Sequence, residues 1–159
     1  MSDARIVRLY VLAVACVAML GACTPILGDR HGVRVPTASL ENTNWMLVQF
    51  ESPDDAIGTV RPADQTQYKM SLGAGGRVTL DLECLHASGH WSVSESSSGH
   101  GTFLLGPLTM TNGECRAGSL ATSIARDAEF VRSYILEGQS LHVSLMADGG
   151  VYTWRRTER

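Results

Sequence analysis

Strict alternation of apolar and polar residues is the feature that most restricts how this chain can fold. Segment 78–84 reads Val-Thr-Leu-Asp-Leu-Glu-Cys, so a strand here would carry four side chains on one face: Val78, Leu80, Leu82 and Cys84. Successive side chains of a β-strand point to opposite faces, and this period of two predicts a strand with one buried face. Glycine-rich turns beside such segments favour hairpins. On this basis we expect strands at 45–50, 68–72, 78–84, 90–93, 103–105, 108–110, 141–145 and 151–154.

Segment 119–136 shows a different period. Its apolar residues follow helical spacing, at Ile124, Ala128, Val131 and Ile135, and predict one helix late in the chain. The polar segments 51–65 and 94–101 are expected to be loops or turns. Strands and helices do not alternate regularly, as a parallel sheet would require. The predicted fold class is therefore α+β, a mainly antiparallel β-sheet of about eight strands with the late α-helix packed on it.

The first residues have the pattern of an export signal. Arg5 and Arg8 give a positively charged start, and residues 9–19 form an uncharged apolar run of 11 residues. As a helix this run would span about 16 Å, whereas the hydrocarbon core of a bilayer is about 30 Å thick. The run is too short for a permanent membrane span and predicts a signal peptide.

A cysteine follows the apolar run closely. Segment 20–23, Leu-Gly-Ala-Cys, resembles the lipobox of bacterial lipoproteins. The resemblance implies that the Cys23 thiol is lipidated, that residues 1–22 are a signal peptide, and that residues 23–39 form the lipidated N-terminus and a flexible tether. Thr24 in place of Asp favours the periplasmic face of the outer membrane, where the cell has one. The alternative is an unmodified cysteine near an ordinary cleavage site.

Cysteine usage fits an exported domain. Of the four cysteines, Cys16 lies in the apolar run and Cys23 in the lipobox, which leaves Cys84 and Cys115. An even pair in an exported domain predicts one disulfide. By restricting the unfolded chain it would contribute roughly 3.5 kcal/mol to stability. The alternative is two free, buried cysteines.

Several short motifs follow one another in a fixed order from residue 40 to residue 156. Together they resemble the META domain, also called the HslJ-like family. Glu83-Cys84-Leu85 stands where that family usually has Gly-Cys-Asn. The motifs are Leu40-x4-Trp45, Gly75-Gly76 leading to Cys84, Gly89 to Trp91, Leu108-Thr109-Met110-Thr111 with Cys115, Glu129-Phe130, and Gly138 to Leu141.

The resemblance implies a small α+β domain, residues 40–156, that is associated with the cell envelope. It implies loose links to heat or antibiotic stress and to secretion. It implies no defined reaction, because a fold does not carry a function by itself.

Composition excludes some function classes. The chain has 13 Lys and Arg against 16 Asp and Glu, a net charge of −3, and 44% hydrophobic residues, so it is neither disordered nor a basic nucleic-acid binder. No enzyme motif occurs, and we expect no catalytic residues, no cofactor and no bound metal. A weaker alternative is a metal-dependent enzyme at Cys84, His86 and His90, which carry zinc or copper ligands. A disulfide at Cys84 would remove the thiolate that this site needs.

Aromatic residues leave a second alternative open. The larger rings are expected to fill the core, but they could instead line a cavity, as in a lipocalin-like carrier of a small apolar ligand. Our main expectation is an anchored envelope lipoprotein whose domain binds or scaffolds without catalysis. Its partners would be the membrane, through the lipid, and an unidentified envelope protein or small ligand. The rings in question are Trp45, Trp91, Trp154, Phe50, Phe103 and Tyr152.

Overall fold

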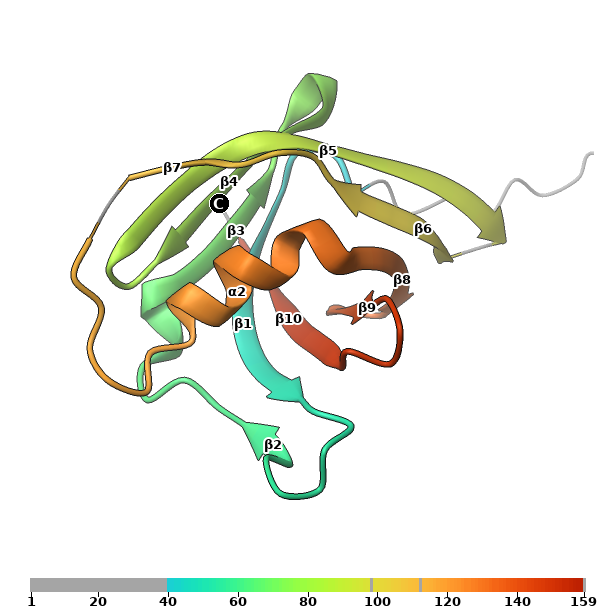
Figure 1. Ribbon diagram of the computed structural model, residues 1–159. Coiled ribbons are helices and arrows are strands. Elements are labelled where there is room, and N and C mark those ends of the chain that lie inside the picture. The colour runs from blue at the N-terminus through green and yellow to red at the C-terminus, as the bar shows by residue number, and fades with distance from the viewer. Residues whose placement is uncertain (1–39, 98, 112, 159) are drawn as a thin grey trace, which may run out of the picture. The chain divides into compact units, whose positions relative to one another are not determined.

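The computed structural model describes residues 40–97, 99–111 and 113–158 (Figure 1). The predicted signal peptide, the lipidation site Cys23 and the tether lie outside the described residues. The strands are β1 (Thr43–Glu51), β2 (Thr59–Val60), β3 (Tyr68–Leu72), β4 (Arg77–Leu82), β5 (Leu85–Ser97), β6 (His100–Leu105), β7 (Thr109–Met110), β8 (Val131–Glu137), β9 (Ser140–Leu145) and β10 (Val151–Thr157). The helices are α2 (Ala121–Asp127) and the 3-10 turns η2 (Gln65–Gln67), η3 (Ala74–Gly76) and η4 (Ala128–Phe130).

The strands form one antiparallel sheet that closes on itself. Its order is β10-β9-β8-β6-β5-β4-β3-β1-β2, and β1 also pairs with β10. A register shift between Leu47 and Gln49 marks an irregularity in β1, which pairs with β3 through its first half and with β10 along most of its length. Such bulges bend a strand and increase its twist. The predicted class, a mainly antiparallel α+β fold with one late α-helix, is confirmed.

The inner face of this closed sheet is the core. Trp45, Leu47, Leu80 and Phe103 are at most 1% exposed. Trp91, Tyr152 and Trp154 are also buried, so most of the aromatic rings fill the core as expected. A cavity of about 20 Å³ remains between the sheet and α2, room for about one water molecule.

The predicted helix is correct in its first half and wrong in its second. α2 and η4 end at Phe130, and Val131–Glu137 form β8 instead. The register of β8 shifts between Val131 and Ser133, and both Val131 and Tyr134 are buried. A bulge adds one residue between two side chains that face inward. These side chains are then three residues apart instead of two, and a spacing of three also occurs on one face of a helix. Ile135, assigned to the apolar helix face, is 46% exposed on the strand.

Two strand boundaries also differ from the prediction. β4 ends at Leu82, and Glu83 with Cys84 forms the turn to β5, so Cys84 is not part of the strand face. Segment 94–101 was expected to be a turn, but most of it extends β5 and β6. Gly101 lets these strands approach closely, because a Cβ there would lie 2.2 Å from the carbonyl oxygen of Ser94.

Within the described residues, no helix has the length and apolar character needed to cross a membrane.

Candidate functional site

A groove of about 340 Å³ opens at one end of the closed sheet. Three chain segments far apart in sequence form its walls: the end of β1 with the β1–β2 connection, the helical segment α2–η4, and the β9–β10 turn. We call it the mouth groove. It is lined by Phe50, Ser52, Ile57, Val60, Leu120, Ser123, Arg126, Asp127, Phe130, Leu145, Met146 and Gly149.

Exposed apolar side chains gather in the mouth groove. Ile57 is 57% exposed, Met146 42% and Phe130 39%. They are three of the seven large apolar residues that are exposed in the described part of the chain. Single exposed apolar residues are normal on a protein surface, but several in one concave site mark a binding site.

The β9–β10 turn is shaped to close against β1. Ala147 and Asp148 adopt positive φ, and Gly150 has a φ of 108°. A Cβ at Gly150 would lie 2.7 Å from the ring of Phe50, so only glycine allows this approach. The ring of Phe50 in turn packs 4.5 Å from that of Tyr152, measured between centroids. The wall of the groove is therefore fixed by backbone conformation as well as by side-chain packing.

A buried carboxylate lies at the floor of the groove. Asp127 is 8% exposed, and both of its oxygens accept a hydrogen bond. The Arg126 Nε donates to Oδ1 over 2.8 Å, and the Tyr152 hydroxyl donates to Oδ2 over 2.7 Å. Burial, followed by the Asp127 contact, raises the pKa of the Tyr152 phenol. Tyr152 therefore stays protonated and remains a donor to Asp127 at any physiological pH.

The mouth groove lies at the far end of the domain from the point where the chain enters it. Leu40 lies just before β1, whereas the groove residue Phe50 is near the end of β1 and Ser52 follows its last residue. A strand of nine residues is roughly 25–30 Å long. The groove therefore lies at the other end of β1 from Leu40.

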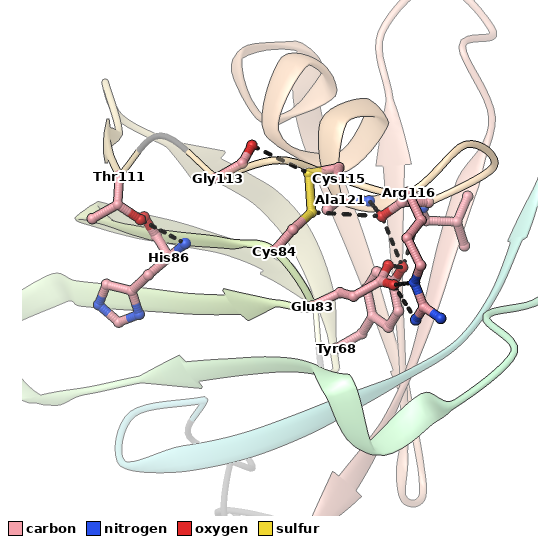
Figure 2. Close-up of a disulfide and its surroundings, with 11 residues drawn as sticks. Tyr68, Glu83, Cys84, His86, Thr111, Gly113, Cys115, Arg116 and Ala121 are labelled. Carbon is pink, nitrogen blue, oxygen red and sulfur yellow. Dashed lines mark hydrogen bonds and ion pairs between the residues drawn. A yellow bond between two sulfur atoms is a disulfide. The ribbon is translucent and has the colours of Figure 1, made fainter.

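The predicted disulfide joins Cys84 to Cys115 (Figure 2). It connects the β4–β5 turn to the segment before α2, with 5.1 Å between the two Cα atoms. Gly113 packs so closely over this turn that a Cβ there would overlap the carbonyl oxygen of Cys84. The disulfide thus holds the N-terminal side of α2, one wall of the mouth groove, against the sheet.

A hydrogen-bond network surrounds the disulfide (Figure 2). The Tyr68 hydroxyl donates to Glu83 over 2.6 Å, and the Arg116 Nε donates to the same carboxylate over 2.7 Å. Hydrogen bonds from Ser119, then Tyr68 and Arg116, lower the pKa of Glu83 to about 2. The Tyr68 oxygen also accepts from the backbone N–H of Leu120, at the start of α2. These contacts strengthen the same junction that the disulfide closes.

The three predicted metal-ligand candidates do not come together. Cys84 is held in the disulfide, and the Nδ1 of His86 lies 2.5 Å from an oxygen of Asp81. His90 pairs in register with Arg77, at the other end of the β4–β5 hairpin. In the described part of the chain, no group of three or more His, Cys, Asp or Glu side chains lies close enough together to hold a metal ion.

Little in the sequence indicates the mouth groove. Its exposed apolar residues are 57, 130 and 146, and none belongs to a periodic pattern. The segment Asp148-Gly149-Gly150 is typical of a tight turn between two strands, but it does not indicate the surface that this turn forms with β1.

Solved structures share this fold, although no family model and no curated protein matches the sequence. A protein from Burkholderia xenovorans, solved by NMR, has a TM-score of 0.60 and 18% identity over 76% of this chain and 85% of its own. A DUF4847 family protein from Bacteroides vulgatus, solved by crystallography, has a TM-score of 0.54 and 10% identity over 74% of this chain and 94% of its own. At these identities the similarity establishes the fold alone.

Proposed function

We propose that this domain is a non-catalytic binding module that holds a small apolar ligand in the mouth groove. The observation that carries the proposal is the gathering of Ile57, Phe130 and Met146 in one concave site. Ligand sites in proteins are typically clefts of about 300–1,000 Å³ with mainly apolar walls and a few polar groups, and they favour the open ends of closed sheets. The volume and lining of the groove fit this description.

The proposed ligand occupies the groove and not the interior of the sheet. A lipocalin-like carrier encloses its ligand among the strands, but the interior cavity here has only about 20 Å³. α2 and the rings of Phe103 and Trp154 occupy that space.

We further infer that the chain is an envelope lipoprotein with a META-like domain, and that the protein has a role in envelope stress. The lipobox at residues 20–23 supports the anchor, on the periplasmic face of the outer membrane where one exists. The β4–β5 turn supports the family. Glu83 has a φ of 51°, and the family usually has glycine at this position, the residue best suited to positive φ.

The anchor is tested by Cys23→Ser. In cells fed an alkyne analogue of palmitate, the wild-type chain is expected to take up the label and to sediment with membranes. The variant is expected to lose the label entirely, because the thioether sulfur is absent. Cys16→Ser is the matched control and should label like wild type. Equal labelling of the Cys23→Ser chain would remove the anchoring proposal without affecting the groove.

The groove is tested with N-phenyl-1-naphthylamine, an uncharged apolar probe that fluoresces when it leaves water. Binding to the oxidised chain is expected, and Ile57→Ser and Met146→Ser should each raise its Kd about fivefold, because each removes part of an apolar wall. Ile135→Ser is the control, since Ile135 is exposed to a similar degree on β8, outside the groove. No binding, or an equal effect of Ile135→Ser, would contradict the proposed function.

A further inference from the structure

The mouth groove presents one ionic group to a ligand. Its lining contains two charged residues, Arg126 and Asp127. The Asp127 carboxylate is buried and both oxygens are occupied, so it cannot pair with a ligand cation. The Arg126 side chain is 68% exposed. A ligand in this groove therefore meets a guanidinium and no accessible carboxylate of the lining.

Asp127 holds Arg126 by one nitrogen only. The Nε donates to Asp127, and no other polar contact of the Arg126 side chain is found among the described residues. The N–H groups of its two terminal nitrogens remain available and lie in the plane of the guanidinium. This geometry allows two parallel hydrogen bonds to a carboxylate or a phosphate. The bond to Asp127 restricts the guanidinium before a ligand arrives, which reduces the entropy lost on binding.

Neutral donors and apolar side chains complete the site. The hydroxyls of Ser52 and Ser123 line the groove together with Arg126. Ser123 lies three positions before Arg126 on α2, so the two share a helix face. The exposed apolar side chains of Ile57, Phe130 and Met146 form the remaining surface. The groove therefore combines an anion-recognising group with an apolar wall.

We propose that the ligand of the mouth groove is a free anionic amphiphile, with its acidic head on Arg126 and its chain along Ile57, Phe130 and Met146. This inference rests on the proposed function and names the class of ligand. The groove is concave and has a volume of about 340 Å³, which suits one free molecule better than the flat surface of a membrane.

The test compares three probes that each carry a ten-carbon chain. Their binding is measured by calorimetry on the full chain with Cys23→Ser, so that no attached acyl chain competes for the groove. Decanoate is expected to bind about tenfold more tightly than decanol, the difference typical of a charge-assisted hydrogen bond. Decyltrimethylammonium should bind no more tightly than decanol. Arg126→Gln should abolish the preference, so that decanoate binds no more tightly than decanol, and Arg126→Lys should keep part of the preference.

Arg132→Gln is the matched control. Arg132 lies beside the groove, but its donors are directed to the carbonyls of Glu129 and Val131 and to the sulfur of Met146. This variant should keep the full preference. Because Arg126→Gln also removes a partner of buried Asp127, its melting curve is recorded, and the decanol Kd reports whether the groove remains intact.

The outcomes separate the two levels of inference. Equal binding of decanoate and decanol, or a preference that survives Arg126→Gln, would overturn the anionic ligand and leave an apolar groove in place. Failure of all three probes would overturn the proposed function and this inference with it. Sedimentation with phosphatidylglycerol vesicles that depends on Arg126 would identify a membrane headgroup and overturn the free amphiphile.

Discussion

Replacing Cys84 and Cys115 together by serine is expected to lower the free energy of unfolding by about 3.5 kcal/mol. The disulfide bridges a sequence separation of 31 residues, and a cross-link over that distance restricts the unfolded chain by about this amount. For a domain of this size the loss corresponds to a fall in Tm of roughly 10 °C. Urea or thermal unfolding of both chains, followed by circular dichroism, measures the effect.

The reducing agent dithiothreitol supplies the control for this variant. It should lower the Tm of the wild type toward that of the double variant and leave the double variant unchanged. Because the cross-link holds the N-terminal side of α2, reduction should also increase the Kd of the apolar probe in the mouth groove. An unchanged Tm would show that the network of Tyr68, Glu83 and Arg116 is sufficient to hold this junction.

The sequence predicted strands correctly where the apolar residues of an alternating segment are the residues buried in the structure. β3, β4 and β9 alternate strictly between buried and less buried residues, and each was expected within a few residues of its observed bounds. The cysteine pair was predicted by counting, because export leaves two candidates. In these cases the information lies within five to seven consecutive residues or in one residue type.

The wrong predictions of helix and strand bounds lie where an irregular backbone interrupts the two-residue period of a strand. The bulge in β8 gives Val131 and Tyr134 helical spacing although both belong to a strand. A positive φ at Glu83 ends β4 at Leu82, two residues before the alternating pattern ends at Cys84. Neither event can be read from apolar spacing, because both depend on how a neighbouring strand pairs.

The mouth groove could not be predicted for a different reason. It is formed by three segments that become neighbours only when β1 pairs with β10 and the helix packs over the sheet. Arg126 and Asp127 are adjacent in sequence, yet one is 68% exposed and the other is buried. Which of the two is exposed follows from the side of α2 on which each lies. Closure of the sheet therefore creates the site.

Replacing Phe103 by alanine is expected to be among the most damaging single changes, with a loss of about 4 kcal/mol. Phe103 is fully buried, and its ring lies between those of Trp91 and Tyr134, with centroids 6.1 and 6.3 Å away. Phe103 is paired with Val93 of β5, but the β6–β8 pairing stops at Thr102, so side-chain packing holds β6 to β8 beyond that point. The measurement is equilibrium unfolding in urea.

Leu104→Ala is the matched control for Phe103→Ala. Leu104 is the next residue of the same strand and is 39% exposed, so its loss should cost about 0.5 kcal/mol. Equal effects of the two variants would contradict the burial of Phe103. The alanine at 103 would also enlarge the cavity of about 20 Å³ that Phe103 lines with Met70 and Leu80. An apolar cavity of that kind binds benzene, and benzene should therefore raise the Tm of Phe103→Ala and leave that of Leu104→Ala unchanged.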